Sequence, residues 1–319
     1  MARRDLRQFG LADGLIQRRG KKTAWLDQVD AAIDWTAVET VVEGIYASRE
    51  GGLAYPLLTY LKLVLLQQWY NLSDEGLEAA VDDRLSFRRF AGLPLAESVP
   101  DHSSIWRFRE QLARRGLAER VLAEINRQLD AKGLILRKGT LIDASIIDAA
   151  VKPPAGDAGE VSPHDPDAGW TKKNGKSRFG YKAHVALDQD SGLVRQAIMT
   201  PADVHDSVKA DELVQGDEDA VYGDKAYDSE ARRTALKARG IKPRIMYKAK
   251  RHKPLKAWQV WFNKATAPIR AGVERVFGTM KRVYSYRRVR YCGLARNNVQ
   301  LQFLGAALNL RRGLTLGLA

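Results

Sequence analysis

The sequence predicts a mixed α/β domain preceded by an all-helical domain, because the spacing of its apolar residues changes near Gly139. Before that point apolar residues recur every three or four positions, as in an amphipathic helix. After it, short runs rich in β-branched residues alternate with helical patterns, which is typical of a sheet flanked by helices. We therefore expect a flexible basic arm over residues 1–22, a helical domain over 23–132 and an α/β domain over 133–319.

The helical domain is predicted from its periodic runs and from residues that can cap helices. The stretch "YPLLTYLKLVLLQQWY" places Leu57, Leu61, Val64 and Leu65 on one helix face. It is too short for a membrane span and contains a lysine, so we expect a buried helix. Ser73 is a candidate N-cap for the next helix, and Asp101 or Ser103 for the helix in "PDHSSIWRFREQLARRG".

The α/β domain is predicted as a strand, a hairpin, a strand, a helix, a strand and a helix, in that order. "TLIDASII" is the first strand, and "FGYKAHVALD" and "LVRQAIMT" form a hairpin around the turn "QDSG". The remaining elements are "DAVYGDKAYD", "SEARRTALKARG", "KPRIMYK" and the helix around Glu274, followed by a last helix near "NVQLQFLGAALNLRRG". Residues 151–178 are polar and rich in Gly, Pro, Asp and Lys, so we expect a loop or a mobile insertion there.

Composition indicates a soluble protein of a reducing compartment, and we expect it in the cytoplasm, associated with the nucleoid. The chain has 319 residues, of which 45% are hydrophobic, and a single cysteine, Cys292, which excludes an internal disulfide. We find no signal sequence at the N-terminus.

The charge of the chain is strongly uneven and favours a polyanion as partner. The net charge is +14, but residues 1–230 carry 30 basic and 37 acidic residues, whereas residues 231–319 carry 22 basic residues and one acid, Glu274. Such a basic segment predicts nucleic-acid binding. A lipid surface is the weaker interpretation, because no stretch in the segment has the large apolar face that membrane binding requires.

Three carboxylates lie at positions that a catalytic or metal-binding role explains better than an ordinary surface charge does. Asp143 lies within the apolar run of the first strand, and a charge buried there is costly unless it is paired or bound to a metal. Asp224 closes the strand "AVYG", although a turn or helix cap would also explain it. Glu274 lies beside a helical stripe of Val273, Phe277 and other apolar residues, and an exposed pair with Arg270 is the simple alternative.

A metal site would account for all three carboxylates together. Two aspartates and a glutamate supply the hard oxygen ligands that Mg²⁺ prefers. Two such ions can activate an attacking oxygen and stabilise a leaving one in phosphoryl transfer. Spacing alone does not distinguish these residues from other carboxylates.

Several segments together resemble the DDE transposases of the insertion-sequence-5 type, within the insertion-sequence-4 superfamily. The resemblance runs from about Trp25 to Arg312, and the matching segments occur in the same order. They are "YPLLTYLKLVLLQQWYNLSDEGLEAAVDDRLSFRRFAGL", "PDHSSIWRFRE", "GTLIDASIID", "GWTKKNGKSRFGYKAHVALDQDSGLV", "TPADVHDS", "VYGDKAYDS" and "RAGVERVFGTMKR".

The resemblance implies an RNase H-like catalytic domain whose triad is Asp143, Asp224 and Glu274. It also implies two bound Mg²⁺ ions, for which Mn²⁺ can substitute. The superfamily signature is Tyr, two residues, Arg, three residues, Glu, six residues, Lys; here Arg270, Glu274 and Lys281 match it, and Ala267 replaces the tyrosine.

The implied activity is cleavage and strand transfer of double-stranded DNA at the ends of a mobile element, by a homodimer that brings two ends together. The helical domain is then expected to recognise the ends. Candidate DNA-binding residues are Arg270, Lys281, Arg282, Lys172, Lys173, Lys176 and Arg178. His205 and Asp206 in "VHDS" either line the site or have a structural role. A DNA-binding protein without catalysis and a metal-dependent nuclease without strand transfer remain as alternatives.

Overall fold

The structure, a computed structural model, describes residue 6 and residues 23–46, 54–154, 160–173 and 175–318. Apart from Leu6, the predicted basic arm over 1–22 lies outside the described residues. The chain divides into two compact units, Met1–Lys132 with Gln302–Ala319, and Gly133–Leu301.

The first unit is helical, and side chains cap three of its helices, α3, α5 and α7. Its elements are α2 (Ala24–Ala32), α3 (Trp35–Thr40), η1 (Glu43–Tyr46), α4 (Leu57–Tyr70), α5 (Asp74–Asp83), α6 (Leu85–Ala91), α7 (His102–Arg115) and α8 (Leu117–Ala131). Ser73 accepts a hydrogen bond from the backbone N–H of Gly76, and Asp101 accepts one from Ser104. In the described part of the chain, no helix has both the length and the apolar character needed to cross a membrane.

The C-terminal residues belong to the first unit, whereas the sequence had suggested that they belong to the α/β domain. Helix α11 (Leu294–Thr315) passes from one unit into the other. The indole N–H of Trp69 donates to the carbonyl of Ala307 at 2.9 Å, and the Asn309 side chain donates to that of Asn126 at 2.7 Å. These contacts explain why residues 302–319 complete the helical unit.

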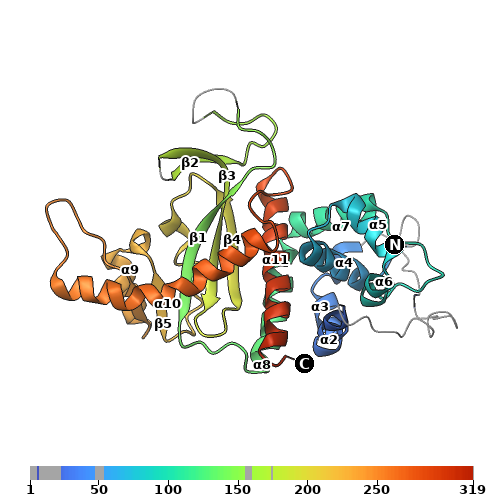
Figure 1. Ribbon diagram of the computed structural model, residues 1–319, viewed down its shortest axis with the longest axis horizontal. Coiled ribbons are helices and arrows are strands. Elements are labelled where there is room, and N and C mark those ends of the chain that lie inside the picture. Colours follow the sequence, from blue (N-terminus) through green and yellow to red (C-terminus); the bar gives the residue numbers. More distant parts are fainter. Residues whose placement is uncertain (1–5, 7–22, 47–53, 155–159, 174, 319) are drawn as a thin grey trace. The chain divides into compact units, whose positions relative to one another are not determined.

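The second unit contains one mixed six-stranded sheet (Figure 1). Its strands are β1 (Thr140–Asp148), β2 (Gly169–Lys173), β3 (Lys176–Asp188), β4 (Val194–Pro201), β5 (Ala220–Gly223) and β6 (Lys242–Ile245), in the order β2-β3-β1-β5-β6, with β4 also paired to β3. β1 runs antiparallel to β3 and parallel to β5, and β5 runs parallel to β6. This is the mixed α/β fold that the sequence predicts, with the elements in the predicted order.

Each face of the sheet is covered by different elements. On one face Ile142, Ala186 and Val221 pack in a buried cluster with Leu213 and Leu236, which belong to the segment after η2 (Asp206–Lys209) and to α9 (Glu230–Ala238). Across the other face runs α10 (Ala257–Arg282), which packs on β1 and β5 (Figure 1). The helix contains Pro268 in its interior.

The polar segment over 151–178 is not a loop throughout, and this part of the sequence prediction was wrong. Residues 169–173 form β2 and pair in register with the start of β3, so that Lys173 lies opposite Lys176. Gly175 has a φ of 75°, which glycine adopts readily. The sequence carries the signal for this hairpin, because Asn174-Gly175 favours a tight turn between strands. Residues 155–159 and Asn174 lie outside the described residues.

Strand β3 is buried on both sides from Phe179 to Asp188, although its sequence alternates as if one side were exposed. His184 is fully buried, and its Nε2 lies 2.9 Å from the hydroxyl of Thr200. Burial lowers the pKa of His184 to about 4, with opposing contributions from the nearby charges of Asp206 and Lys182.

His184 should make the folded state sensitive to acid. In the unfolded chain a histidine gains its proton near pH 6.5, so the unfolded state binds more protons than the folded state between about pH 6.5 and 4. The contribution of this group is fully present above about pH 6.5 and is lost as pH falls towards 4, by roughly 3 kcal/mol at about 1.4 kcal/mol per pKa unit. Urea unfolding at several pH values measures it. We expect His184→Gln to show a shallower decline than the unsubstituted protein, and equal declines would contradict this account.

Candidate active site

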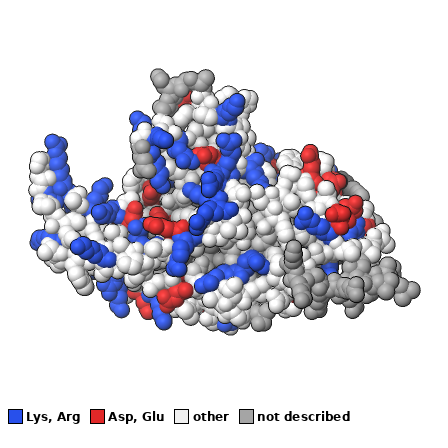
Figure 2. All heavy atoms as spheres, viewed as in Figure 1, with Lys and Arg blue, Asp and Glu red and all other residues white. Residues whose placement is uncertain are grey.

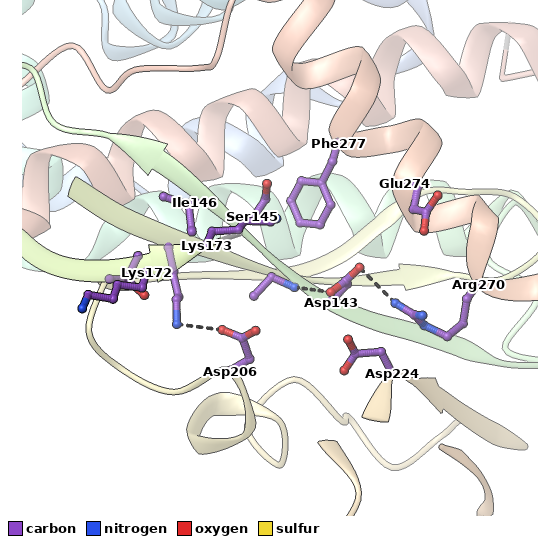
Figure 3. Close-up of a pocket in the computed structure, with 13 residues that line it drawn as sticks. Asp143, Ser145, Ile146, Lys172, Lys173, Asp206, Asp224, Arg270, Glu274 and Phe277 are labelled. Carbon is purple, nitrogen blue, oxygen red and sulfur yellow. Dashed lines mark hydrogen bonds and ion pairs between the residues drawn. The ribbon is translucent and has the colours of Figure 1, made fainter. Parts of the chain in front are cut away.

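A cavity of about 580 Å³ in the second unit is lined by all three carboxylates that the sequence singled out. Figure 3 shows Glu274 on the helix α10, with Asp143 and Asp224 on the strand side of the same cavity. Arg270 and Asp206 also line it. The structure therefore brings together acidic side chains that are separated by 50 to 131 residues along the chain.

Asp143 lies on the face of β1 that α10 covers. One of its carboxylate oxygens accepts a hydrogen bond from the backbone N–H of Ala144 at 2.8 Å, and the other lies 3.2 Å from the guanidinium of Arg270. Burial raises the pKa of Asp143 to about 6; Arg270 opposes the rise, and the neighbouring charges of Asp224 and Asp206 add to it. The ionised form of Asp143 is thus only partly compensated by its protein neighbours.

Asp224 has the capping role that the sequence offered as the simple alternative. It follows β5 directly and caps the short helix η3 (Lys225–Tyr227), where one carboxylate oxygen accepts a hydrogen bond from Ala226 at 2.7 Å. It also lines the cavity. Because β5 is the parallel neighbour of β1, the end of β5 delivers Asp224 to the side of Asp143.

Glu274 does not form the surface pair with Arg270 that was the simple alternative. Arg270 pairs instead with Asp143, which is 127 residues away in the sequence. The Glu274 side chain is exposed and forms no hydrogen bond or ion pair with any residue of the described ranges. Its position at the cavity therefore has no explanation in the packing or pairing of the protein itself.

Arg270 is only partly satisfied by its surroundings. Its side chain is 14% exposed, and its Nε is buried and has no hydrogen-bond partner within the part of the chain that the structure describes. An arginine in this state has donors to offer to an anion that enters the cavity.

The loop "VHDS" contributes Asp206 to the cavity, and His205 does not line it. Asp206 forms an ion pair of 2.9 Å with Lys182 of β3, and both residues line the cavity. The His205 ring accepts a hydrogen bond from the backbone N–H of Ser207 and caps η2. Lys182 could not be found from the sequence, because it lies within a strand whose register is needed to place it.

Apart from Arg270, the predicted DNA-binding residues line the cavity, are exposed away from it, or are engaged by other residues of the protein. Lys172 and Lys173 line the cavity from β2, and Lys176 and Arg282 are exposed away from it. Arg178 is engaged by Asp148, with nitrogen-to-oxygen distances of 2.6 and 2.9 Å. Lys281 is held by β1, as described next.

Lys281 connects the end of α10 to β1. Its ammonium group donates to the hydroxyl of Ser145 at 2.6 Å and to the carbonyl of Ile146 at 3.1 Å. Burial lowers its pKa, and the positive charges of Lys173 and Arg178 act in the same direction. Lys281 therefore has a structural task in addition to any contact with DNA.

The acidic side chains of the cavity fit a hard divalent cation by donor chemistry and by charge. All of the candidate ligands are carboxylate oxygens, which Mg²⁺ prefers, and a bound cation would offset the burial and the neighbouring negative charges that raise the pKa of Asp143. As the side chains stand, no three His, Cys, Asp or Glu residues among those described are spaced to share one ion. Among the candidate ligands, Glu274 is the one whose carboxylate no described residue holds.

Comparison with known proteins identifies the family of the chain. The family model described as Transposase DDE domain matches residues 135–310, more than half of the chain, and the chain belongs to this family. A second model, described as Transposase domain (DUF772), matches residues 15–111.

One solved structure is similar over most of its length. A chain from a crystal structure of a pre-cleavage Mos1 transpososome aligns with 76% of this chain and 77% of its own length, at 12% sequence identity and a TM-score of 0.21. A superposition with so low a TM-score adds nothing to the description of the fold.

Replacing Lys281 should destabilise the second unit. Lys281→Met leaves the Ser145 hydroxyl and the Ile146 carbonyl without this donor, and we expect a loss of about 1–3 kcal/mol in the free energy of unfolding. Arg282→Met is the matched control, because the neighbouring side chain is exposed and bonds only to the carbonyl of Gly278 in its own helix. Chemical denaturation measures both variants; equal stabilities would show that the Lys281 contacts contribute nothing.

Proposed function

We propose that this chain is a transposase of the insertion-sequence-5 type, which binds the terminal inverted repeats of a mobile element and catalyses metal-dependent DNA cleavage and strand transfer. The observation that carries the proposal is the single cavity lined by Asp143, Asp224 and Glu274 within the part of the chain that matches the transposase DDE domain. An RNase H-like description of this unit belongs to the same proposal, and the central β1 with its neighbour β5 supports it.

The three carboxylates are proposed to hold the metal. Asp143 and Asp224 supply oxygens from adjacent strands, and Glu274 turns in from α10. When bound, two Mg²⁺ ions would activate the attacking oxygen and stabilise the leaving oxygen of the phosphodiester. In the absence of the ions Arg270 partly neutralises Asp143.

Basic side chains around the cavity are proposed to hold the DNA backbone. Lys172 and Lys173 line the cavity from β2, and Arg270 lines it from α10. On the face drawn in Figure 2, Lys and Arg gather over the sheet and α10, around the acidic residues. This charge pattern supports attraction of a polyanion towards the carboxylates.

The decisive experiment is a reaction with labelled duplex DNA that carries the repeats flanking the gene. We expect Mg²⁺ or Mn²⁺ to support nicks at the repeat ends and joining of the freed ends to a second duplex. Cleavage without joined products would favour a nuclease. Binding without cleavage in either metal would favour a DNA-binding protein that has no catalytic activity.

The substitution Glu274→Gln should abolish cleavage and joining while leaving the protein folded. The change keeps the shape of the side chain but removes the negative charge that a metal ligand needs. The helix keeps its buried residues Val273, Phe277 and Met280, and no described residue loses an ion pair. Binding to duplex DNA should be unchanged or slightly tighter, because one repulsive charge is gone.

A matched control for this variant is Glu160→Gln, because Glu160 is exposed in the same unit and does not line the cavity. It should retain full activity. Asp143→Asn and Asp224→Asn should resemble Glu274→Gln. Normal strand transfer by Glu274→Gln would falsify the assignment of this residue as a ligand.

Duplex binding should depend steeply on salt. Each phosphate contacted by Lys or Arg releases counterions, so the logarithm of the binding constant should fall by about 0.9 per phosphate for each tenfold rise in salt. Fluorescence anisotropy over a series of salt concentrations measures the slope. A nearly flat dependence would contradict the role given to the basic residues, whatever the outcome of the cleavage reaction.

A further inference from the structure

The first turns of α10 expose two tryptophans that the proposed active site does not use. Trp258 is 52% exposed and Trp261 is 70% exposed. They lie three residues apart on the helix, so that their side chains leave neighbouring turns on the same side. Exposed indoles are rare on a protein surface, since burying them would stabilise the fold.

Trp258 packs against a residue, Tyr247, that is itself fixed by hydrogen bonds. The backbone of Tyr247 is fixed to α10 by Asn263, which accepts from its N–H at 2.8 Å and donates to its carbonyl at 3.0 Å. The Tyr247 ring then packs edge-on against Trp258, with ring centres 5.0 Å apart, and the guanidinium of Arg233 lies 3.8 Å from the centre of the same ring. Trp258 is therefore held by its contact with Tyr247, while much of its surface stays exposed to solvent.

The sequence around the two tryptophans is strongly basic. Residues 242–264 contain eight Lys and Arg residues and no acidic residue. Five of them, all exposed, lie in the segment that leads from β6 into the helix: Lys248, Lys250, Arg251, Lys253 and Lys256. This part of α10 and the segment before it extend past the sheet of the second unit (Figure 1), and blue side chains lie along them in Figure 2.

We propose that this surface, formed by Trp258, Trp261 and the exposed basic residues of 248–264, binds unpaired DNA by stacking bases on the two indoles. The inference rests on the proposed function, and it adds a second DNA site with a different preference. Every base has a flat face that an aromatic ring can stack on, and the basic residues hold the phosphates between the bases. In a duplex the base faces are covered by neighbouring bases, so only an unpaired strand can use the rings.

A second copy of the chain fits this surface less well. Two copies meeting through it would place six positive charges against six others, with no acid in 248–264 to offset them. A strand of DNA has the opposite charge, and its bases are aromatic faces that can stack on the exposed surfaces of the indoles.

The position along α10 links this surface to the cavity. Trp261 precedes Glu274 by thirteen residues in one helix, which corresponds to about 20 Å along the axis. A strand within a duplex advances about 3.4 Å per nucleotide and an unpaired strand is more extended, so the rings would meet a base at most about six nucleotides from the bond at the carboxylates. A strand that is opened near the cut could therefore reach both sites.

The test measures binding to an oligothymidine strand and to a duplex of equal length, with the full chain in a chelator so that no cleavage occurs. The variants are Trp258→Ala with Trp261→Ala, and Trp258→Phe with Trp261→Phe. Trp106→Ala is the matched control, because Trp106 is a 44% exposed tryptophan in the helical unit. Fluorescence anisotropy gives the affinities, and sedimentation gives the oligomeric state of each variant.

We expect the double alanine variant to bind the single strand on the order of 5- to 150-fold more weakly for each ring lost, and to bind the duplex within about twofold of the unsubstituted protein. The double phenylalanine variant should recover most of the affinity, and Trp106→Ala should lose none. Equal weakening for both DNA forms, no weakening, or dissociation of an oligomer in the double alanine variant would overturn the proposal. Failure of the cleavage reaction would instead count against the proposed function, because this binding requires no metal.

Discussion

The close approach of α10 to β1 is the contact on which the arrangement of the site depends. Gly272 lies where the helix comes nearest to the strand, and a Cβ atom at that position would stand 2.9 Å from a methyl carbon of the buried Leu141. On either side of this point the helix is tied to β1, by Arg270 to Asp143 and by Lys281 to Ser145. A bulkier residue at 272 would press on the side chain of Leu141, which is buried beneath the helix.

This contact also governs the electrostatics of the cavity. Asp143 is sheltered from water by its neighbours, and it shares its surroundings with two other aspartates, so its ionised form is disfavoured despite Arg270. The chain thus tolerates, in a strongly basic region, a pocket of negative charge that its own cations do not fully neutralise. Such an arrangement costs stability in the free protein and favours the binding of a cation.

Much of the second unit could be predicted from local sequence, because its strands and helices carry clear patterns. Asp143 stood out as a charge in an apolar strand, and Glu274 as one acid among 22 basic residues. The pair of Arg270 with Asp143 could not be predicted, since the two residues meet only after α10 is laid across β1. The same holds for Lys182 and Asp206, whose contact depends on the path of the segment after β4.

The errors have equally specific causes. The β2–β3 hairpin was assigned to a loop because polar composition was weighed above the Asn174-Gly175 pair that favours a turn. The sequence could not show that the residues from 302 onward pack with the helical unit, because an apolar helix pattern does not say which surface it will cover. Here Trp69 and Asn126, far earlier in the chain, supply the partners.

Pro268 has a mechanical consequence for α10. Proline has no N–H, so the carbonyl of Lys264 lacks its usual donor within the helix, and the helix is weakest between its two halves. The half that carries the tryptophans precedes this point, and the half tied to β1 begins after it at Arg270. A force on the half that carries the tryptophans can therefore bend the helix near Pro268, while Glu274 keeps its position beside the sheet.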